Sequence, residues 1–459
     1  MNSTELQAII DKQEQFFRSG ITLDFGFRLT ALKKLKSLLR DYNDELNEAF
    51  RMDLGKHPFE SYGSEHGLAI QEIGIMIRNL KRWGRPNRAH TPMVHWFARS
   101  YYLNQPYGRV LIISPWNYPL QLLFMPLIGA IAAGNCVLAK PSRYARHTNE
   151  VMNKIITENF DPGHISLVEG SGQTNQVLLE AQFDYIFFTG STEVGKKVMG
   201  AAAKNLTPVS LELGGKSPVI VEPDASPGLA ARRILWGKLL NAGQSCVAPD
   251  YLLAHKNIRE DLIAEMKKYL HSSYGQDIKS SPDYARIINQ ANVERLAGLL
   301  EGKNILIGGE YDPAERYIAP TVVEVEDPDD VLLQEEIFGP ILPLVEYSDL
   351  DEALSFIRNK PRPLALYIFT RSGKIQQKVI QKTQSGTGCI NETVVHFINP
   401  YLPFGGVGKS GMGRYHGKYS YETFSYKRSF LNKATWIDFQ VRYPPYGAGK
   451  IRLLKKLIR

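Results

Sequence analysis

Short apolar runs alternate with stretches of helical period along this chain. In the first half the runs are RVLIIS (109–114), CVLA (136–139), ISLVEG (165–170), YIFF (185–188), VSLEL (209–213) and PVIVE (218–222). Helical patterns dominate before residue 83, and after residue 250 a second alternating set includes YLLAHK, NILIGG and ALYIFT. Buried parallel strands are short continuous apolar runs, so the pattern predicts an α/β fold with doubly wound parallel sheets. In such sheets ligands bind where strands end and helices begin.

One uncharged segment, residues 120–139, has the length of a membrane span. It reads LQLLFMPLIGAIAAGNCVLA, and about 20 apolar residues suffice to cross a bilayer. Pro126 interrupts the segment, and Gly134 followed by Asn135 is typical of a helix end. We therefore expect a buried helix and then a core strand instead of a membrane span.

The composition of the chain indicates its class of protein, its compartment and its kinds of partner. The chain has 459 residues, 43% hydrophobic and 22% charged, which indicates a globular protein of two or three domains. The N-terminus lacks the apolar core of a signal peptide, and three cysteines, Cys136, Cys246 and Cys389, are too few for a disulfide framework, so we expect a cytoplasmic protein. The net charge of +8 fits an anionic cofactor as well as nucleic acid, and we expect no nucleic-acid partner. The histidines show no metal-ligand spacing, so we expect no metal.

The stretch FFTGSTEVGKK (187–197) has the GxxxxGK spacing of a phosphate-binding loop. A nucleoside triphosphatase needs a Ser or Thr after that lysine to bind Mg²⁺. Lys197 occupies the position. The sequence therefore disfavours a triphosphatase and favours another anion held by a strand, a turn and a helix N-terminus.

A reactive residue stands in each of five turns. These residues are Asn117 in PWNYP, Lys140 in LAKPS, Ser191 in TGSTEVG, Glu212 in LELGGKSP and Cys246 in NAGQSC. The amide of Asn117 could donate to a developing oxyanion, and Ser191 with a helix N-terminus could hold a phosphate. Each residue alone also has an ordinary explanation, as a turn former, a solvated charge or a small core side chain.

Together these motifs resemble the aldehyde dehydrogenase superfamily. PWNYP, LAKPS, FTGSTEVG, LELGGKSP, NAGQSC, EEIFGP and PFGGVGKSG occur in the family's order along nearly the whole chain. The short N-terminal region and the tail GMGRYHGKYSYETFSYKRS resemble the class 3 branch, which acts on medium-chain, fatty and aromatic aldehydes. The resemblance implies two doubly wound parallel-sheet domains, one for the cofactor and one for catalysis, plus a small β oligomerisation arm.

The resemblance implies three catalytic residues. A Cys246 thiolate adds to the aldehyde, the Asn117 side chain and the Cys246 backbone N–H hold the oxyanion, and Glu212 activates water to hydrolyse the thioester. A free cysteine is only a few per cent thiolate at neutral pH, so we expect hydrogen-bond donors and a desolvated pocket to assist it.

It also implies that the anion at FTGSTEVG is NAD or NADP. Ser191 meets a phosphate, Lys140 reaches the adenine ribose, and Glu336 and Phe338 contact the nicotinamide ribose and ring. Where many class 3 members carry a glutamate, this chain has Arg143, which suits the 2′-phosphate of NADP or is simply solvated. The full expected set of cofactor contacts is Trp116, Lys140, Ser142, Arg143, Gly190, Ser191, Gly195, Leu213, Gly214, Glu336 and Phe338.

The resemblance divides the chain into domains. Residues 1–87 and 107–208 are expected to form the dinucleotide-binding domain, 209–417 the catalytic domain, and 88–106 with 418–440 the oligomerisation arm. Exposed aromatics on such an arm are hazardous in a monomer, so we expect a homodimer.

The last segment, residues 441–459, is a basic tail. Its final ten residues hold Lys450, Arg452, Lys455, Lys456 and Arg459, with Ile451, Leu453, Leu454, Leu457 and Ile458 between them. This pattern predicts a short basic amphipathic helix. Its apolar side is expected to dock on the protein or its dimer partner, and weak contact with an anionic membrane is the alternative.

Two other functions stay open within the resemblance. A catalytically silent binding protein is disfavoured because Cys246, Glu212 and Asn117 are all present. An enzyme that passes the thioester to coenzyme A is the nearer rival, and Glu212 favours water as the acceptor. The sequence therefore predicts NAD(P)-dependent oxidation of a small-molecule aldehyde to the acid.

Overall fold

A computed structural model describes residues 3–170 and 172–457 of the chain. Its first domain is built on a six-stranded sheet of order β17-β7-β6-β3-β4-β5, parallel except for β17. The strands are β3 (Arg109–Ile113), β4 (Cys136–Lys140), β5 (Ile165–Leu167), β6 (Tyr185–Gly190), β7 (Val209–Leu213) and β17 (Gly411–Met412). The predicted doubly wound sheet is confirmed.

Both faces of this sheet are covered, which explains the continuous apolar runs. Val110 and Ile112 belong to one hydrophobic core, and Leu111 and Ile113 to another, because successive side chains point to opposite faces. Residues of α2, α5, α6 and α7 share the first core, and residues of α1, α8 and α9 share the second. These helices are α1 (Ser3–Arg18), α2 (Phe25–Asp41), α3 (Asn43–Leu54), α4 (Pro58–Ser64), α5 (His66–Trp83), α6 (Gln121–Ala133), α7 (Arg146–Thr157), α8 (Gly172–Glu180) and α9 (Thr192–Lys204).

The uncharged segment 120–139 forms the buried helix α6 and the buried strand β4. The helix continues past Pro126 and ends at Gly134, whose φ of 99° is left-handed, as the sequence predicted. Within the described residues, no helix combines the length and the apolar character that crossing a bilayer requires.

The second domain is built on a seven-stranded sheet of order β10-β13-β14-β9-β8-β15-β16, in which only β10 runs antiparallel. The strands are β8 (Pro218–Val221), β9 (Tyr251–His255), β10 (Asn304–Ile307), β13 (Thr321–Glu324), β14 (Ile341–Tyr347), β15 (Ala365–Phe369) and β16 (Thr387–Ile390). A hairpin, β11 (Tyr311–Asp312) with β12 (Tyr317–Ile318), lies beside α12. The helices are α10 (Pro227–Leu239), α11 (Arg259–Tyr274), α12 (Gln290–Gly298), α13 (Leu350–Arg358) and α14 (Gly373–Lys382).

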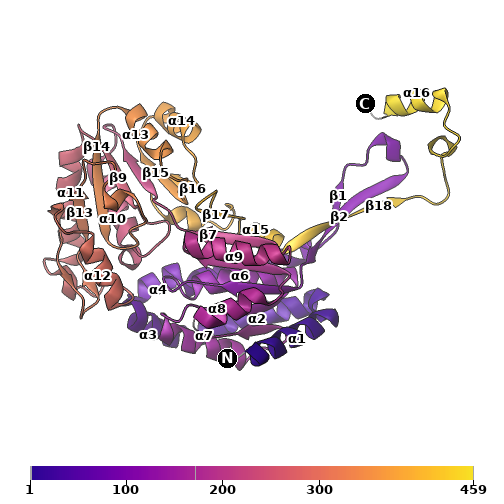
Figure 1. Cartoon of the computed structure of the whole chain (residues 1–459), viewed down its shortest axis with the longest axis horizontal. Coiled ribbons are helices and arrows are strands. Elements are labelled where there is room, and N and C mark those ends of the chain that lie inside the picture. Colours follow the sequence, from indigo (N-terminus) through magenta and orange to yellow (C-terminus); the bar gives the residue numbers. More distant parts are fainter. Residues whose placement is uncertain (1–2, 171, 458–459) are drawn as a thin grey trace.

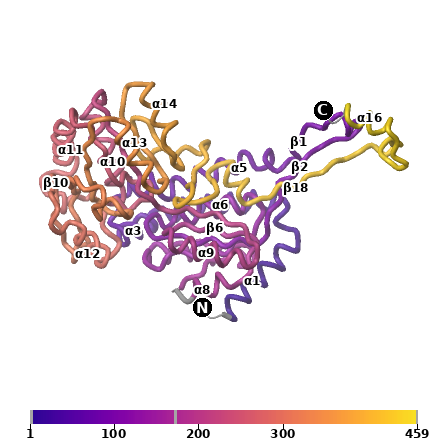
Figure 2. Tube along the Cα trace, turned by 45° about the horizontal axis from the view of Figure 1, so that its top comes forward, coloured from indigo at the N-terminus to yellow at the C-terminus, as the bar shows by residue number. Residues whose placement is uncertain are grey.

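A three-stranded antiparallel arm extends away from both domains (Figures 1 and 2). It consists of β1 (Asn87–Ala89), β2 (Ala98–Pro106) and β18 (Ser425–Lys433). β2 and β18 pair along their whole length, from Pro106 opposite Ser425 to Ala98 opposite Lys433. The helix α16 (Ala448–Leu457) lies at the far end of the arm (Figure 1).

Two expected boundaries are shifted by packing. β7 pairs with β6 in the first sheet, so residues 209–213 belong with the segment before them, and the division falls later than 208. The helix α15 (Lys418–Thr423) packs against α6, so the arm begins near Ser425 and not at residue 418.

Candidate active site

The turns singled out by sequence converge on one edge of the first sheet. β3 ends opposite both β4 and β6, with Ile113 paired to Lys140 and to Phe188. Glu212 on β7 lies opposite Thr189, one residue before the turn at Gly190. Because parallel strands end at the same edge, the segments that carry Asn117, Lys140, Ser191 and Glu212 emerge on one side.

Cys246 lies in the second domain, after a sharp irregular loop. Asn241, Ala242 and Gly243 have φ of 52°, 50° and 76°, the left-handed region that costs a non-glycine residue free energy. The Gln244 side chain braces this loop by donating to Asn241 O at 2.9 Å and accepting from the Ile288 N–H at 2.9 Å. The loop is thereby held in one shape.

The Cys246 side chain faces an apolar pocket with aromatic walls. The pocket is lined by Tyr118, Gln121, Leu122, Ser245, Cys246, Val247, Phe397, Phe404, Tyr415 and His416. Phe404 stacks on His416, and Tyr415 meets both rings edge-on. Such a pocket favours an apolar substrate beside the thiol.

Burial opposes ionisation of the Cys246 thiol. It raises the thiol's pKa far above the ordinary value, and the charges of Glu336 and Glu212 raise it further. The backbone N–H groups of Cys246 and Val247 lower it. The expectation that a desolvated pocket assists the thiolate is therefore wrong for this form, because desolvation disfavours the charged state; the expected donors do assist it.

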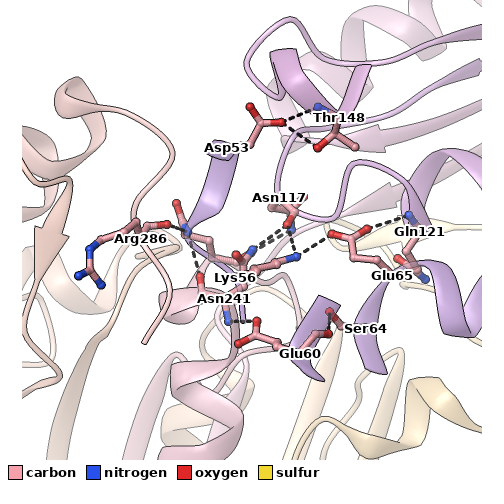
Figure 3. Close-up of polar contacts among 11 residues, drawn as sticks. Asp53, Lys56, Glu60, Ser64, Glu65, Asn117, Gln121, Thr148, Asn241 and Arg286 are labelled. Carbon is pink, nitrogen blue, oxygen red and sulfur yellow. Dashed lines mark hydrogen bonds and ion pairs between the residues drawn. The ribbon is translucent and has the colours of Figure 1, made fainter. Parts of the chain in front are cut away.

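Asn117 is 2% exposed and reaches across to the cysteine loop. Its Nδ2 donates to Gln244 O at 3.0 Å, and its own carbonyl accepts from Asn241 Nδ2 at 2.7 Å (Figure 3). An amide nitrogen carries two hydrogens, so one stays available for an oxyanion. The structure thus links the expected oxyanion donor to the loop of the expected nucleophile.

Glu212 is 3% exposed, and neither of its carboxylate oxygens has a hydrogen-bond partner among the described residues. Burial raises the pKa of Glu212 well above its ordinary value, and the nearby Arg414 cation opposes that shift. The Glu212 charge also acts on the Cys246 thiol, so the two groups lie within electrostatic reach. A buried, unpaired carboxyl of this kind is typical of a catalytic base.

A cavity of about 670 Å³ lies between the two domains, where a dinucleotide fits. Its walls include Ser191, Gly214, Glu336 and Lys409. Ser191 is the N-cap of α9, and its Oγ accepts from the Val194 N–H at 3.4 Å, so the positive end of the helix faces this cavity.

Two glycines here are required by close packing. A Cβ at Gly214 would lie 1.9 Å from Glu336 Oε2, and a Cβ at Gly195 would lie 2.7 Å from Leu213 Cδ2. Gly214 therefore lets the backbone approach the Glu336 carboxyl, and Gly195 lets α9 pack on β7. Gly190 ends β6 just before the cap.

Trp116 and Phe338 bring the two domains together at the other end of the site. Their rings meet edge-on with centroids 5.5 Å apart, and Phe338 has a left-handed φ of 56°. Burial raises the pKa of Glu336 to about 8, and the charge of Asp250 raises it too. The EEIFGP loop thus carries a half-buried carboxyl that lines the cavity and a ring that contacts Trp116.

Three further expected contacts, Lys140, Ser142 and Arg143, lie at the end of β4 and in the turn after it. Lys140 is 5% exposed, and burial lowers its pKa, with the Arg143 charge adding to that effect. Arg143 is exposed, and its guanidinium lies 5.3 Å from the centre of the Tyr144 ring. Lys140, Ser142 and Arg143 are not among the described residues that line the 670 Å³ cavity.

Several residues of the site carried no sequence-based role. Asp250 accepts from Lys216 Nζ at 2.5 Å and from the Ile337 N–H at 3.2 Å, which ties the EEIFGP loop to the cysteine segment. The pocket aromatics Tyr118, Phe404 and Tyr415 stand inside or beside the quoted motifs. Their position in or next to these motifs was the sequence feature that could have indicated a role in the site. Only the fold shows that the rings of Phe404 and Tyr415 meet.

The comparisons with known proteins agree with this geometry. The family model described as "Aldehyde dehydrogenase family" matches residues 1–430. The chain is 47% identical to the 4,4'-diaponeurosporen-aldehyde dehydrogenase of Staphylococcus aureus, with 97% of each chain covered. It is 44% identical to aldehyde dehydrogenase family 3 member B1 of Rattus norvegicus, with 97% of this chain and 96% of the relative covered.

Solved structures give the same result. A substrate-bound state of Staphylococcus aureus AldH superposes with a TM-score of 0.97 at 46% identity, covering 99% of both chains. The match extends over the sheets, the loops and the arm together. The chain therefore belongs to the aldehyde dehydrogenase family, in its class 3 branch, as an NAD(P)-dependent enzyme that oxidises aldehydes.

Proposed function

We propose that this enzyme oxidises apolar aldehydes, medium- or long-chain aliphatic or aromatic, to carboxylic acids, with Cys246, Asn117 and Glu212 as its catalytic residues. The observation that carries the substrate class is the aromatic pocket around Cys246, which includes Tyr118, Phe404 and Tyr415. Burying an apolar chain there removes its surface from water and orients the carbonyl at the thiol.

The reaction begins when the Cys246 thiol passes its proton to water and the thiolate Sγ bonds to the carbonyl carbon. The carbonyl electrons move to oxygen, and the free N–H of Asn117 donates to that oxyanion. A nicotinamide coenzyme, when bound, would supply the hydride acceptor. When the hydride leaves, the carbonyl re-forms as a thioester on Cys246. Glu212 then takes a proton from water, the water oxygen attacks the thioester, the C–S bond breaks, and the acid departs.

The cofactor is NAD or NADP, and we propose that Ser191, Gly214 and Glu336 hold it in the 670 Å³ cavity. The α9 N-terminus attracts a phosphate, and the close approach at Gly214 leaves room for the nicotinamide ribose beside Glu336. We assign Lys140 and Arg143 to the adenine ribose side because Lys140 ends β4 and Arg143 lies in the turn that follows it.

We also propose a homodimer and a cytoplasmic location. β18 and β16 both present an outer edge, and Trp96 and Trp436 at the arm are 64% and 73% exposed. The three cysteines are free, which fits a reducing compartment.

The mechanism is tested with Cys246→Ala and Glu212→Gln. Cys246→Ala is expected to abolish NAD(P)H formation, whereas Glu212→Gln gives one fast turnover and then stalls at the thioester, in stopped-flow absorbance with decanal or benzaldehyde. Cys389→Ala, a half-buried thiol outside the site, is the matched control and retains activity.

Unaltered steady-state turnover in Glu212→Gln would remove Glu212 as the deacylating base. Turnover that requires added coenzyme A would identify the acyl-transferring alternative. A series of aldehydes of increasing chain length tests the substrate class, and kcat/KM that falls with chain length contradicts an apolar pocket.

A further inference from the structure

A fully buried ion pair lies beneath the turn that carries Asn117. Lys56 Nζ and Glu65 Oε1 are 2.6 Å apart, and both side chains are 0% exposed. Lys56 precedes α4 and Glu65 directly follows it, so one short helix brings the two charges together. Lys56 Nζ also lies 4.1 Å from the centre of the Tyr118 ring.

A buried ion pair is costly, and a well-packed apolar pair of similar volume is often as stable or more so. The stability of the fold therefore gives little reason for these two charges. Their remaining hydrogen bonds give a better one, because both end on the same catalytic turn.

The pair holds both ends of residues 117–121. Lys56 Nζ donates to Asn117 O at 3.3 Å, and Glu65 Oε2 accepts from the Gln121 N–H at 3.0 Å, where α6 begins (Figure 3). The Lys56 ammonium thus bonds the first residue of the turn and the Glu65 carboxylate bonds the last. Each charge compensates the other.

The loop that leads from Asn241 to Cys246 also contacts the Asn117 carbonyl. The Asn117 carbonyl accepts from Asn241 Nδ2 at 2.7 Å as well as from Lys56, so both of its lone pairs are used. The Asn241 N–H in turn donates to Glu60 Oε1 at 2.7 Å. Residues 56–65 therefore contact both the turn of the oxyanion donor and the loop that leads to Cys246.

We propose that Lys56 and Glu65 are positioning residues for the oxyanion donor. This inference rests on the catalytic role proposed for Asn117. With its carbonyl held by two donors, the Asn117 peptide is restrained from rotating, and the side chain extends from that fixed backbone to its hydrogen bond with Gln244 O. A donor that is already oriented needs no reorganisation when the oxyanion forms.

The test compares two neutral versions of the pair. Lys56→Met/Glu65→Gln, the Met version, removes the donor to the Asn117 carbonyl. Lys56→Gln/Glu65→Gln, the Gln version, has the same net charge as the Met version but supplies a donor again. Gln at position 65 keeps an acceptor for the Gln121 N–H. The measured quantity is the rate of the first NAD(P)H turnover with decanal, together with KM for the coenzyme.

We expect the Met version to slow the first turnover by about tenfold or more, since removal of one oxyanion donor costs about 10²–10³-fold. KM for the coenzyme changes less than about twofold, because only transition-state stabilisation is lost. The Gln version recovers most of the rate. In an Asn117→Ala background the Met version causes no further loss, because the group it positions is absent.

Lys303→Met/Asp330→Asn is the matched control, since Lys303 Nζ and Asp330 Oδ2 also pair at 2.6 Å but contact neither catalytic segment. It leaves the first turnover unchanged. If the Met version does not fold, as judged by its melting curve, Asn241→Gly removes the other donor to the Asn117 carbonyl and keeps the left-handed backbone. The same lack of additivity with Asn117→Ala is expected.

Three results would overturn the proposal. Losses from the Met version and from Asn117→Ala that multiply independently would show a merely structural pair. A normal first turnover in the Met version, with a slow one in Asn117→Ala, would remove the positioning role and leave the proposed function intact. A normal first turnover in Asn117→Ala itself would contradict the proposed oxyanion donor, and the positioning role with it.

Discussion

At the scale of single residues, burial sets the chemistry of the acidic groups. Burial raises the pKa of Cys246, Glu212 and Glu336. It also raises the pKa of Glu72, which packs under α15. Glu72 Oε1 accepts from the Gly417 N–H at 2.7 Å, next to the pocket residue His416. The active site and its support therefore hold several carboxyls that favour the neutral form.

Glu72 makes a pH-dependent contribution to stability. Burial raises its pKa to about 7, so the folded state binds a proton that the unfolded state releases above its ordinary carboxyl pKa. The stability contributed by Glu72 is full at low pH and falls as pH rises toward 7. Glu72→Gln keeps the acceptor and removes the titration.

We expect the melting temperature of Glu72→Gln, relative to that of the wild type, to rise by a few degrees between pH 5 and pH 7.5. This rise corresponds to a change of about 2 kcal/mol in the free energy of unfolding. Glu260→Gln, an exposed carboxyl on α11, is the control and shows no such trend. A constant difference between variant and wild type across this range would show that Glu72 does not titrate there.

Arg143 decides the coenzyme in our proposal. If its guanidinium meets the 2′-phosphate of NADP, Arg143→Glu lowers the ratio of kcat/KM for NADP over NAD by about tenfold, or 1.4 kcal/mol of charge-assisted bonding. Arg146→Glu, another exposed arginine nearby, is the control. Equal effects on the two coenzymes would show that Arg143 is only a solvated charge.

At the scale of elements, the basic tail forms the predicted helix, α16, and three of its apolar side chains stay exposed instead of docking on the chain. Ile451, Leu453 and Leu454 are 52%, 44% and 49% exposed. Lys450 Nζ ties the helix to the preceding segment through Gln440 O and Tyr443 O. Ile458 and Arg459 lie outside the described residues. The expected docking therefore requires the dimer partner, with an anionic membrane as the alternative.

Truncation after Gly449 separates these two occupants. With docking on the partner, the full chain and the truncated chain co-sediment equally and weakly with anionic liposomes at physiological salt. Each cation near such a surface contributes about 1 kcal/mol, so strong binding that is lost on truncation would establish membrane contact instead. Neutral liposomes are the control for apolar adsorption.

At the scale of the whole molecule, the arm projects away from the body that the two sheet domains form (Figure 1). β18 uses one edge for β2 and leaves the other unpaired within the described chain. A long strand with a free edge is prone to pair with another chain. We therefore propose that a second copy of the chain pairs with this edge.

We therefore expect a dimer in sedimentation velocity. Leu431→Glu places a charge on β18, where Leu431 is 47% exposed, and is expected to shift the dimer toward monomer. Leu206→Glu, at a leucine that is 90% exposed on the body, is the control and leaves the mass unchanged. A monomeric wild type at micromolar concentration would contradict the dimer.

The sequence by itself determined the elements and the residue types of the site. The runs RVLIIS, CVLA and YIFF matched the buried strands β3, β4 and β6 because both faces of the first sheet are covered. Gly134 ended α6 where its left-handed φ requires glycine. The motifs also identified the family, because their order along the chain is specific. These signals are local, so they can be read without coordinates.

Only the tertiary structure decided which elements pair and what each side chain meets. VSLEL and PVIVE both indicate short strands, yet β7 joins the first sheet and β8 the second, since hydrogen-bond partners and not the local pattern assign a strand to a sheet. Lys56 lies 61 residues from Asn117, and Asn241 lies 124 residues from it, yet both donate to its carbonyl. Burial of that ion pair, of Cys246 and of Glu212 arises from the packing of distant segments, so their electrostatics could not be read from the chain alone.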